Sequence, residues 1–192
     1  MDKAVFLDRD GVINYLVLNK KTNEYEAPFK EEDFVMFPDV IEALKQLINL
    51  NYKLFLISNQ PDFAKGKTSL ENLLSVHKRM DFTFKENNIV FSEYYYCYHH
   101  PKGIIPEYSI ACKCRKPGNL FLKQAQLKYS LDMHSSWIIG DRDTDIYCGQ
   151  SVSTKAILIK QKHFDGKAGQ SKPDYIVNNL KEAVEIIKNA TN

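Results

Sequence analysis

The segment FLDRDGVIN, residues 6–14, places three charged side chains directly after an apolar run. Asp8 and Asp10 end this run, and Arg9 lies between them. Side chains alternate between the two faces of a strand, so we expect both carboxylates on one face and Arg9 on the other. Two carboxylates on one face repel each other unless a cation lies nearby or one of them holds a proton. The segment therefore predicts a metal ion or acid–base chemistry at the end of the first strand.

Further polar groups follow two later apolar segments. Ser58, Asn59 and Gln60 end or follow a run that begins at residue 53, and Asp141 follows residues 136–140. Each group alone is also compatible with a turn or with the acidic first turn of a helix. Together they place hydroxyl, amide and carboxylate groups after successive strands. This pattern indicates one polar site that several strand ends share.

The elements that would position these groups alternate between short apolar strands and amphipathic helices. We predict strands at residues 4–8, 53–58, 93–96, 136–140, 156–160 and 175–177, and helices at 38–48, 68–85, 120–129, 143–149 and 180–188. Such alternation is typical of a parallel sheet with helices on both faces, which binds ligands at the carboxyl ends of its strands. The sequence thus predicts an α/β fold, a Rossmann-like three-layer sandwich with a mostly parallel sheet. Residues 161–173 are expected to form a loop.

The composition is that of an ordinary globular protein. The chain has 192 residues, of which 44% are hydrophobic, and its formal net charge is +2. This length predicts a single domain over residues 1–192. The charge gives no reason to expect binding to nucleic acid or to an anionic membrane, and no segment approaches the roughly 20 apolar residues of a spanning helix. We expect a cytoplasmic monomer.

A second group of potential metal ligands lies in residues 97–117, CYHHPKGIIPEYSIACKCRKP. Cysteines in a reducing compartment are more often metal ligands or core residues than disulfides. Two pairs of soft ligands fit a closed, tetrahedral structural zinc site. The candidate ligands are Cys97, His99, Cys112 and Cys114, and His100 is an alternative to His99 on spacing. We therefore expect a zinc-binding loop at residues 97–114, which would also position the neighbouring Lys116.

Four segments, DRDGVIN, ISNQ, CRKP and IIGDRDTD, resemble the motifs of the haloacid dehalogenase (HAD) phosphatase superfamily, over residues 6–160. The resemblance implies that Asp8 is a nucleophile that forms an aspartyl-phosphate. It implies that Asp10 protonates the leaving alkoxide and then activates water. Ser58 would hold phosphoryl oxygens, Lys116 would supply a fixed positive charge, and Asp141 would help to hold Mg²⁺.

The physical chemistry of phosphate esters agrees with these roles. The ester and the attacking carboxylate are both anionic, so a cation must lie between them. Mg²⁺ needs only one or two carboxylates besides phosphate and water. We expect it to be held by Asp8, Asp141 and the backbone carbonyl near Asp10, which leaves the Asp10 side chain free to carry a proton. Lys116 would stabilise charge on the transferring phosphoryl group.

The sequence of the expected zinc-binding loop is similar to that of one branch of this superfamily. The arrangement C-x-H-H-P followed by C-x-C-R-K-P resembles the branch that contains D,D-heptose 1,7-bisphosphate phosphatases and histidinol-phosphate phosphatase domains, and it implies that the four candidates above are zinc ligands. By position in that branch, the substrate contacts would be Asn59, Gln60, Pro61, Arg115 and Arg142. About 50 residues separate Asp8 from Ser58, which leaves no room for a large cap domain.

The resemblance implies removal of the C7 phosphate from a heptose 1,7-bisphosphate, a small phosphorylated sugar, for lipopolysaccharide or another surface glycan. The chain departs from the branch at residues 15–21 and 61–63, and at Arg142, where the branch usually has lysine. These departures affect loops that would face the substrate. Hydrolysis of histidinol phosphate or another small phosphomonoester is the alternative activity. A zinc-stabilised binding module is the non-enzymatic alternative.

Overall fold

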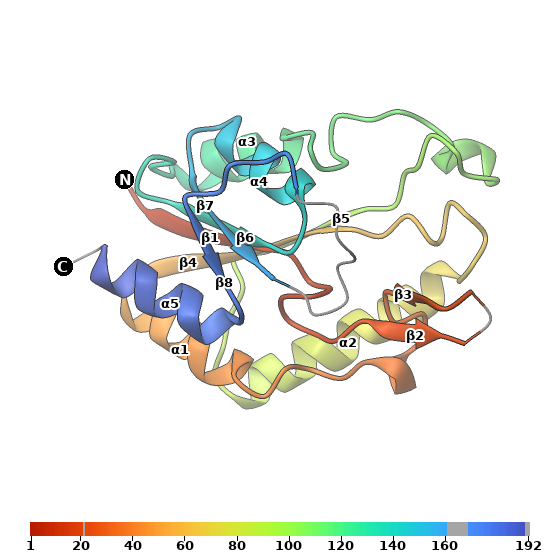
Figure 1. The fold of residues 1–192 in the computed structure, drawn as a ribbon, viewed down its shortest axis with the longest axis horizontal. Coiled ribbons are helices and arrows are strands. Elements are labelled where there is room, and N and C mark those ends of the chain that lie inside the picture. Colours follow the sequence, from red (N-terminus) through yellow and green to blue (C-terminus); the bar gives the residue numbers. More distant parts are fainter. Residues whose placement is uncertain (21, 161–168, 191–192) are drawn as a thin grey trace.

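The computed structural model describes residues 1–20, 22–160 and 169–190. Six strands form one parallel sheet in the order β5-β4-β1-β6-β7-β8 (Figure 1). These strands are β1 (Lys3–Leu7), β4 (Tyr52–Asn59), β5 (Glu93–Cys97), β6 (Trp137–Gly140), β7 (Lys155–Ile159) and β8 (Tyr175–Val177). The helices are α1 (Val40–Asn49), α2 (Leu70–Glu86), α3 (Leu120–Tyr129), α4 (Asp143–Gln150) and α5 (Leu180–Asn189). The predicted strands and helices are all present, with ends that differ by a few residues.

The core is divided between the two faces of the sheet. On β1, Val5 and Leu7 belong to one buried cluster, whereas Ala4 and Phe6 belong to the other. Helices α1, α2 and α5 pack on the first face, and α3 and α4 cover the second (Figure 1). The three-layer α/β prediction is therefore confirmed. The strands are buried on both faces, and this is why they consist of continuous apolar runs instead of alternating apolar and polar residues.

Long helix α2 begins where a side chain can satisfy its first backbone amides. Ser69 is the N-cap residue, and its hydroxyl accepts a hydrogen bond from the Asn72 amide at 3.1 Å. The helix that was predicted over residues 68–85 therefore begins just after Ser69. Thr68 instead donates to the Phe29 carbonyl oxygen at 2.9 Å and ties the preceding loop to the helix.

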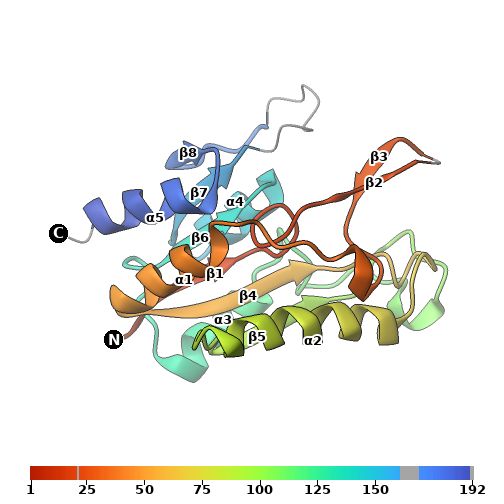
Figure 2. The same cartoon turned by 90° about the horizontal axis from the view of Figure 1, so that it is seen from below.

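A two-stranded antiparallel hairpin is the main element that the sequence did not predict. It comprises β2 (Val17–Asn19) and β3 (Glu24–Glu26) and lies between the predicted strand at 4–8 and the predicted helix at 38–48, where no strand was predicted. Figure 2 shows it projecting past the ends of the central strands. Two short 3₁₀ helices, Glu31–Asp33 and Pro106–Tyr108, were also not predicted. Residues 161–168 of the predicted loop lie outside the described residues.

No helix among the described residues is long and apolar enough to cross a membrane.

Candidate active site

The order of the strands brings the predicted catalytic groups together. β1 lies between β4 and β6, and all three run in the same direction. Asp8 follows β1, Asp141 follows β6, and Ser58 and Asn59 end β4. The carboxyl ends of three adjacent strands therefore form one site.

Three buried carboxylates form a potential cation site. Oxygens of Asp8, Asp141 and Asp145 all lie within 4.8 Å of one another. Burial raises the pKa of Asp141 well above its usual value, and the charge of Asp8 raises it further. Asp141 Oδ1 is buried and accepts no hydrogen bond from the described residues. A hard cation would satisfy this oxygen and offset the repulsion, so the donor set fits Mg²⁺.

Asp145 was not among the residues assigned to the site from the sequence. Its side chain is 1% exposed and lies in the first turn of α4. The segment DRDTD, residues 141–145, contains a signal for this residue, because Asp145 is the third carboxylate in the segment that begins at Asp141. The sequence alone could not distinguish a site residue from a carboxylate that favours the helix N-terminus.

Lys116 supplies the positive charge of this site. Its ammonium nitrogen is 3.0 Å from Asp8 Oδ1 and 2.6 Å from Asp145 Oδ1, and it donates to the Ile57 carbonyl oxygen at 2.6 Å. Burial disfavours the charged form, but Asp145 and Asp8 raise the pKa of Lys116 above its ordinary value. The lysine is thus charged and held between the predicted nucleophile and the first turn of α4.

Asn59 fixes the backbone of this lysine. The side-chain nitrogen of Asn59, Nδ2, donates to the Lys116 carbonyl oxygen at 3.1 Å. The side-chain oxygen, Oδ1, accepts from the Lys116 backbone amide at 3.0 Å. Asn59 therefore joins the end of β4 to the segment that follows the cysteine-rich loop. Both partners of this pair also line the pocket described below.

Asp10 lies close to Asp8, the predicted nucleophile, but its carboxylate is bonded to other partners. It accepts hydrogen bonds from Arg9, Asn14 and Gln60. The expected direction of Arg9 was wrong, because β1 ends at Leu7 and strand alternation does not extend through residue 9. The Arg9 guanidinium instead folds back onto Asp10, with Nη2 at 2.9 Å from Oδ1.

A pocket of about 400 Å³ opens at these strand ends. It is lined by the predicted residues Asp8, Asp10, Asn59, Pro61, Arg115, Lys116 and Arg142. Other lining residues include Glu24, Tyr25 and Glu26 of the hairpin region, together with Asp62, Lys65, Lys67 and Asp145. Ser58, Gln60 and Asp141 are absent from this lining and are buried. The pocket therefore presents both carboxylates and cationic side chains to a bound molecule.

The hairpin is connected to the opposite wall of this pocket. Lys67 forms an ion pair with Glu26 and lies 3.8 Å from Asp62 Oδ1. Asn19 also donates to Glu26, at 2.7 Å. Burial disfavours ionisation of Glu26, but its hydrogen bonds with Lys67 and Asn19 lower its pKa below the ordinary value. These contacts hold the hairpin over the site.

The four predicted zinc ligands form one cluster. The cysteine sulfurs are 3.2 to 3.6 Å apart, and His99 Nδ1 is 3.4 Å from Cys114 Sγ. These separations approach the edge of about 3.8 Å expected for tetrahedral zinc with Zn–S bonds of about 2.3 Å. His100 lies outside the cluster, and its Nδ1 accepts from the Lys102 amide at 3.1 Å. The donor set fits a closed structural zinc site.

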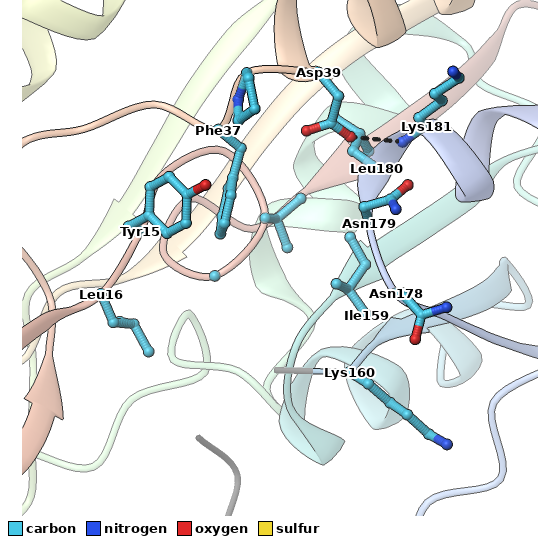
Figure 3. Close-up of a pocket in the computed structure, with 13 residues that line it drawn as sticks. Tyr15, Leu16, Phe37, Asp39, Ile159, Lys160, Asn178, Asn179, Leu180 and Lys181 are labelled. Atoms are coloured by element: carbon cyan, nitrogen blue, oxygen red, sulfur yellow. Dashed lines mark hydrogen bonds between the residues drawn. The ribbon is translucent and has the colours of Figure 1, made fainter. Parts of the chain in front are cut away.

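A second cavity of about 440 Å³ lies beside the loop that follows β1 (Figure 3). Gly11 and Val12 contribute to one wall, and the first residues of α5 contribute to another. Asp39 accepts a hydrogen bond from the Lys181 amide at 3.0 Å across this cavity. None of the predicted catalytic, substrate or metal-binding residues lines it.

Comparisons with known proteins agree with this geometry. A family model described as HAD-hydrolase-like matches residues 113–183. The chain is 30% identical to a D-glycero-beta-D-manno-heptose-1,7-bisphosphate 7-phosphatase from Yersinia pestis, over 96% of this chain and 95% of the relative. It is 38% identical to a D-glycero-alpha-D-manno-heptose-1,7-bisphosphate 7-phosphatase from Photorhabdus laumondii, over 84% of each chain.

A solved structure shares the fold. The D,D-heptose 1,7-bisphosphate phosphatase from B. bronchiseptica, complexed with magnesium and phosphate, has a TM-score of 0.77 at 19% identity. The alignment covers 98% of this chain and 99% of that protein. The sequence identities, the fold and the arrangement of carboxylates around a buried lysine lead to one assignment. The chain belongs to the heptose-1,7-bisphosphate 7-phosphatase family of HAD-like hydrolases.

Proposed function

We propose that the protein is a Mg²⁺-dependent phosphatase that removes the C7 phosphate of a D-glycero-D-manno-heptose 1,7-bisphosphate, for lipopolysaccharide or another surface glycan. The observation that carries this proposal is the buried group of Asp8, Asp141, Asp145 and Lys116, which adjoins a pocket that also presents Lys65, Arg115 and Arg142. The relatives named above act on this class of substrate by name. We further propose that it acts as a cytoplasmic monomer.

The chemistry proceeds in two steps. An Asp8 oxygen attacks phosphorus, and the bond from phosphorus to the sugar oxygen breaks while Asp10 gives a proton to that oxygen. Water then attacks the aspartyl-phosphate, Asp10 takes a proton from the water, and the bond between phosphorus and Asp8 breaks. The products are inorganic phosphate and heptose 1-phosphate.

Other residues stabilise the charge that moves during these steps. Lys116 is already within 3.0 Å of Asp8 Oδ1 and can contact the transferring phosphoryl group. We assign Ser58 to the phosphoryl oxygens. Mg²⁺, held by Asp8, Asp141 and the Asp10 backbone carbonyl with Asp145 nearby, would neutralise charge on the phosphoryl oxygens.

The second phosphate of the substrate requires cations away from the reacting centre. Arg115 and Arg142 line the pocket, as does Lys65. The Arg115 guanidinium donates to the His99 carbonyl oxygen at 3.5 Å, which connects it to the cysteine-rich loop. We propose Asn59, Pro61, Arg115 and Arg142 as substrate contacts. Gln60, which the resemblance also suggests, is 1% exposed and bonded within the protein.

We assign zinc to the cluster of Cys97, His99, Cys112 and Cys114, with a structural role. All four protein ligands are present, so no position is left for a reacting molecule. Arg115 follows the last ligand directly, and Lys116 follows Arg115. The metal would therefore fix the loop that leads to Arg115, whereas Lys116 also has its own contacts with Asn59, Asp8 and Asp145.

Phosphate release in the presence of Mg²⁺ tests the assignment. The substrates are heptose 1,7-bisphosphate in both anomers, fructose 1,6-bisphosphate and histidinol phosphate, and Asp8→Asn is the control. A large kcat/KM preference for one heptose anomer that Asp8→Asn abolishes would support the proposal. Preference for histidinol phosphate would replace the substrate. Equal activity of the wild type and Asp8→Asn would exclude the aspartyl-phosphate mechanism.

A further inference from the structure

Arg9 is a buried charge to which the proposed mechanism gives no role. Its side chain is fully buried and is among the largest buried side chains of the protein. A buried guanidinium is costly unless it is paired and hydrogen-bonded. The partners of Arg9 therefore indicate why a charge is present at this position.

The principal partner is the proposed acid–base residue. Arg9 Nε and Nη2 donate to Asp10 Oδ1 at 3.1 and 2.9 Å, and Nη2 also reaches Oδ2 at 3.0 Å. Burial disfavours the charged guanidinium, but the Asp10 carboxylate raises the pKa of Arg9. A fork of this kind fixes the plane of a carboxylate as well as its position.

Gln60, which directly follows β4, forms hydrogen bonds with both Arg9 and Asp10. Its side-chain oxygen accepts from Arg9 Nη2 at 3.1 Å, and its amide nitrogen donates to Asp10 Oδ2 at 2.6 Å. The same nitrogen donates to Ser58 Oγ at 3.0 Å. The amide thus connects Arg9, the proposed acid–base residue and the proposed phosphoryl-binding hydroxyl. Together with Asn14, these donors engage both oxygens of Asp10.

A second layer of side chains lies behind the guanidinium. Burial raises the pKa of Tyr96, and the nearby charge of Arg9 opposes this shift. The Tyr96 hydroxyl is 3.0 Å from His77 Nδ1 on α2. The guanidinium of Arg9 therefore lies near Tyr96 of β5 as well as Gln60, and Tyr96 is in turn held by α2.

We propose that Arg9, held by Gln60, is a positioning residue that sets the location and plane of the Asp10 carboxylate for proton transfer. Asp10 must reach the departing sugar oxygen in the first step and the attacking water in the second. Both transfers require hydrogen-bond distances to the reacting oxygen. A misplacement of about 1 Å can reduce a rate by about 10²-fold. This inference rests on the proposed function, since it assigns a role within the same reaction.

The two steps can be separated with p-nitrophenyl phosphate. Its leaving group is weakly basic and needs little proton transfer, so formation of the aspartyl-phosphate depends less on Asp10 than its hydrolysis does. For Arg9→Lys and Gln60→Met we expect a rapid burst of nitrophenolate close to one per enzyme, followed by steady-state turnover reduced by about 10²-fold. Lysine keeps a positive charge but cannot form the fork. Quenched-flow with rapid acid precipitation would detect the accumulated aspartyl-phosphate.

A matched variant separates positioning from loss of stability. Ser136 is fully buried at the other end of β1, where its hydroxyl accepts from the Ala4 amide at 2.9 Å. Ser136→Ala should lower the melting temperature without producing a burst. Gln60→Met keeps the ion pair between Arg9 and Asp10, and it provides a second variant if Arg9→Lys does not fold.

The outcomes of these experiments distinguish support for the inference, failure of the inference and failure of the proposed function. A burst with slow turnover in both folded variants supports the inference. Folded variants that lose burst rate and turnover to the same extent, or that keep full turnover, would overturn it while the wild type remains active. A wild type that releases no phosphate in the presence of Mg²⁺ would instead contradict the proposed function.

Discussion

At the scale of single residues, Asp145 shows how one carboxylate can serve both a helix and a site. Asp145 Oδ2 accepts from the Arg142 amide at 3.0 Å and so satisfies an amide at the start of α4. Its other oxygen pairs with Lys116. The charge of Asp145 also raises the pKa of Asp8, after the larger effect of burial. The residue therefore balances the lysine while it orders the loop that carries Asp141.

We predict that Asp145→Asn reduces kcat by about 10- to 100-fold with little change in fold. The amide oxygen can still accept from the Arg142 backbone, but the variant leaves Lys116 paired with Asp8 alone, which makes Asp8 a weaker nucleophile. Steady-state phosphate release and circular dichroism would measure the two effects. Asp132→Asn, which changes a half-buried carboxylate outside the pocket, is the control for a change in charge. Unchanged kcat in Asp145→Asn would contradict this role.

At the scale of elements, the cysteine-rich loop supports more than the lysine that follows it. The amides of Ile104 and Ile105 donate to the Ala64 carbonyl oxygen at 2.7 and 3.2 Å. The Phe63 and Tyr108 rings are 4.7 Å apart in an edge-to-face arrangement. The loop therefore packs against the segment that carries Pro61 and Lys65, so disorder in the loop would affect two walls of the pocket.

We predict that removal of the proposed zinc ion raises KM more than it lowers kcat. Lys116 remains held by Asn59, Asp8 and Asp145 without the loop, whereas Arg115 and the segment after β4 lose their support. Cys112→Ser and zinc chelation should both show this split, with the circular dichroism of the sheet and helices retained. Readdition of Zn²⁺ should restore the chelated wild type but not the variant. Full activity of the metal-free protein would exclude a supporting role.

The hairpin gives a second prediction at this scale. Lys67→Met removes the ion pair with Glu26, and we expect KM to rise about two- to fivefold, which corresponds to the roughly 0.5–1 kcal/mol of a partly exposed pair. The change in kcat should be smaller, because the hairpin carries none of the proposed reacting groups. Lys128→Met, on α3, removes an exposed ion pair with Glu93 of β5 and serves as the control. An equal rise in KM for both variants would refute the effect.

At the scale of the whole molecule, the site couples protonation to stability. Burial raises the folded pKa values of Asp8 and Asp141 above the ordinary 3.8. Between the ordinary and the raised values, these two groups bind more protons in the metal-free folded protein than in the unfolded chain. Their contribution to stability therefore falls as pH rises through this window. Mg²⁺, which we propose binds the ionised carboxylates, should offset this loss.

We predict that Mg²⁺ raises the melting temperature more at about pH 8 than at about pH 5, because protons compete with the metal in the lower range. Thermal unfolding with Mg²⁺ or with a chelator, at several pH values, measures the difference. Asp141→Asn should remove most of the Mg²⁺ effect at the higher pH. An increment that does not depend on pH would show that these carboxylates do not hold the metal.

Several features could be predicted because they depend on short stretches of sequence. Continuous apolar runs alternate with amphipathic segments, so the strands, the helices and the α/β class follow from local patterns. Ligands bind next to the carboxyl ends of the strands in a parallel sheet, and so Asp8, Ser58 and Asp141 could be assigned to one edge. The paired spacing of cysteines and histidine gave the second cluster, although spacing alone left His99 and His100 as alternatives.

Only the tertiary structure decided which side chains meet. Strand order sets the neighbours of Asp8, and this order depends on packing between segments that are far apart in the sequence. Arg9 turns back to Asp10 because β1 ends before it and Gln60 arrives from β4. The hairpin lies over the pocket through an ion pair between residues 26 and 67. Local pattern thus fixes which residues end each strand, whereas long-range packing fixes the partners that give those residues their charge state and direction.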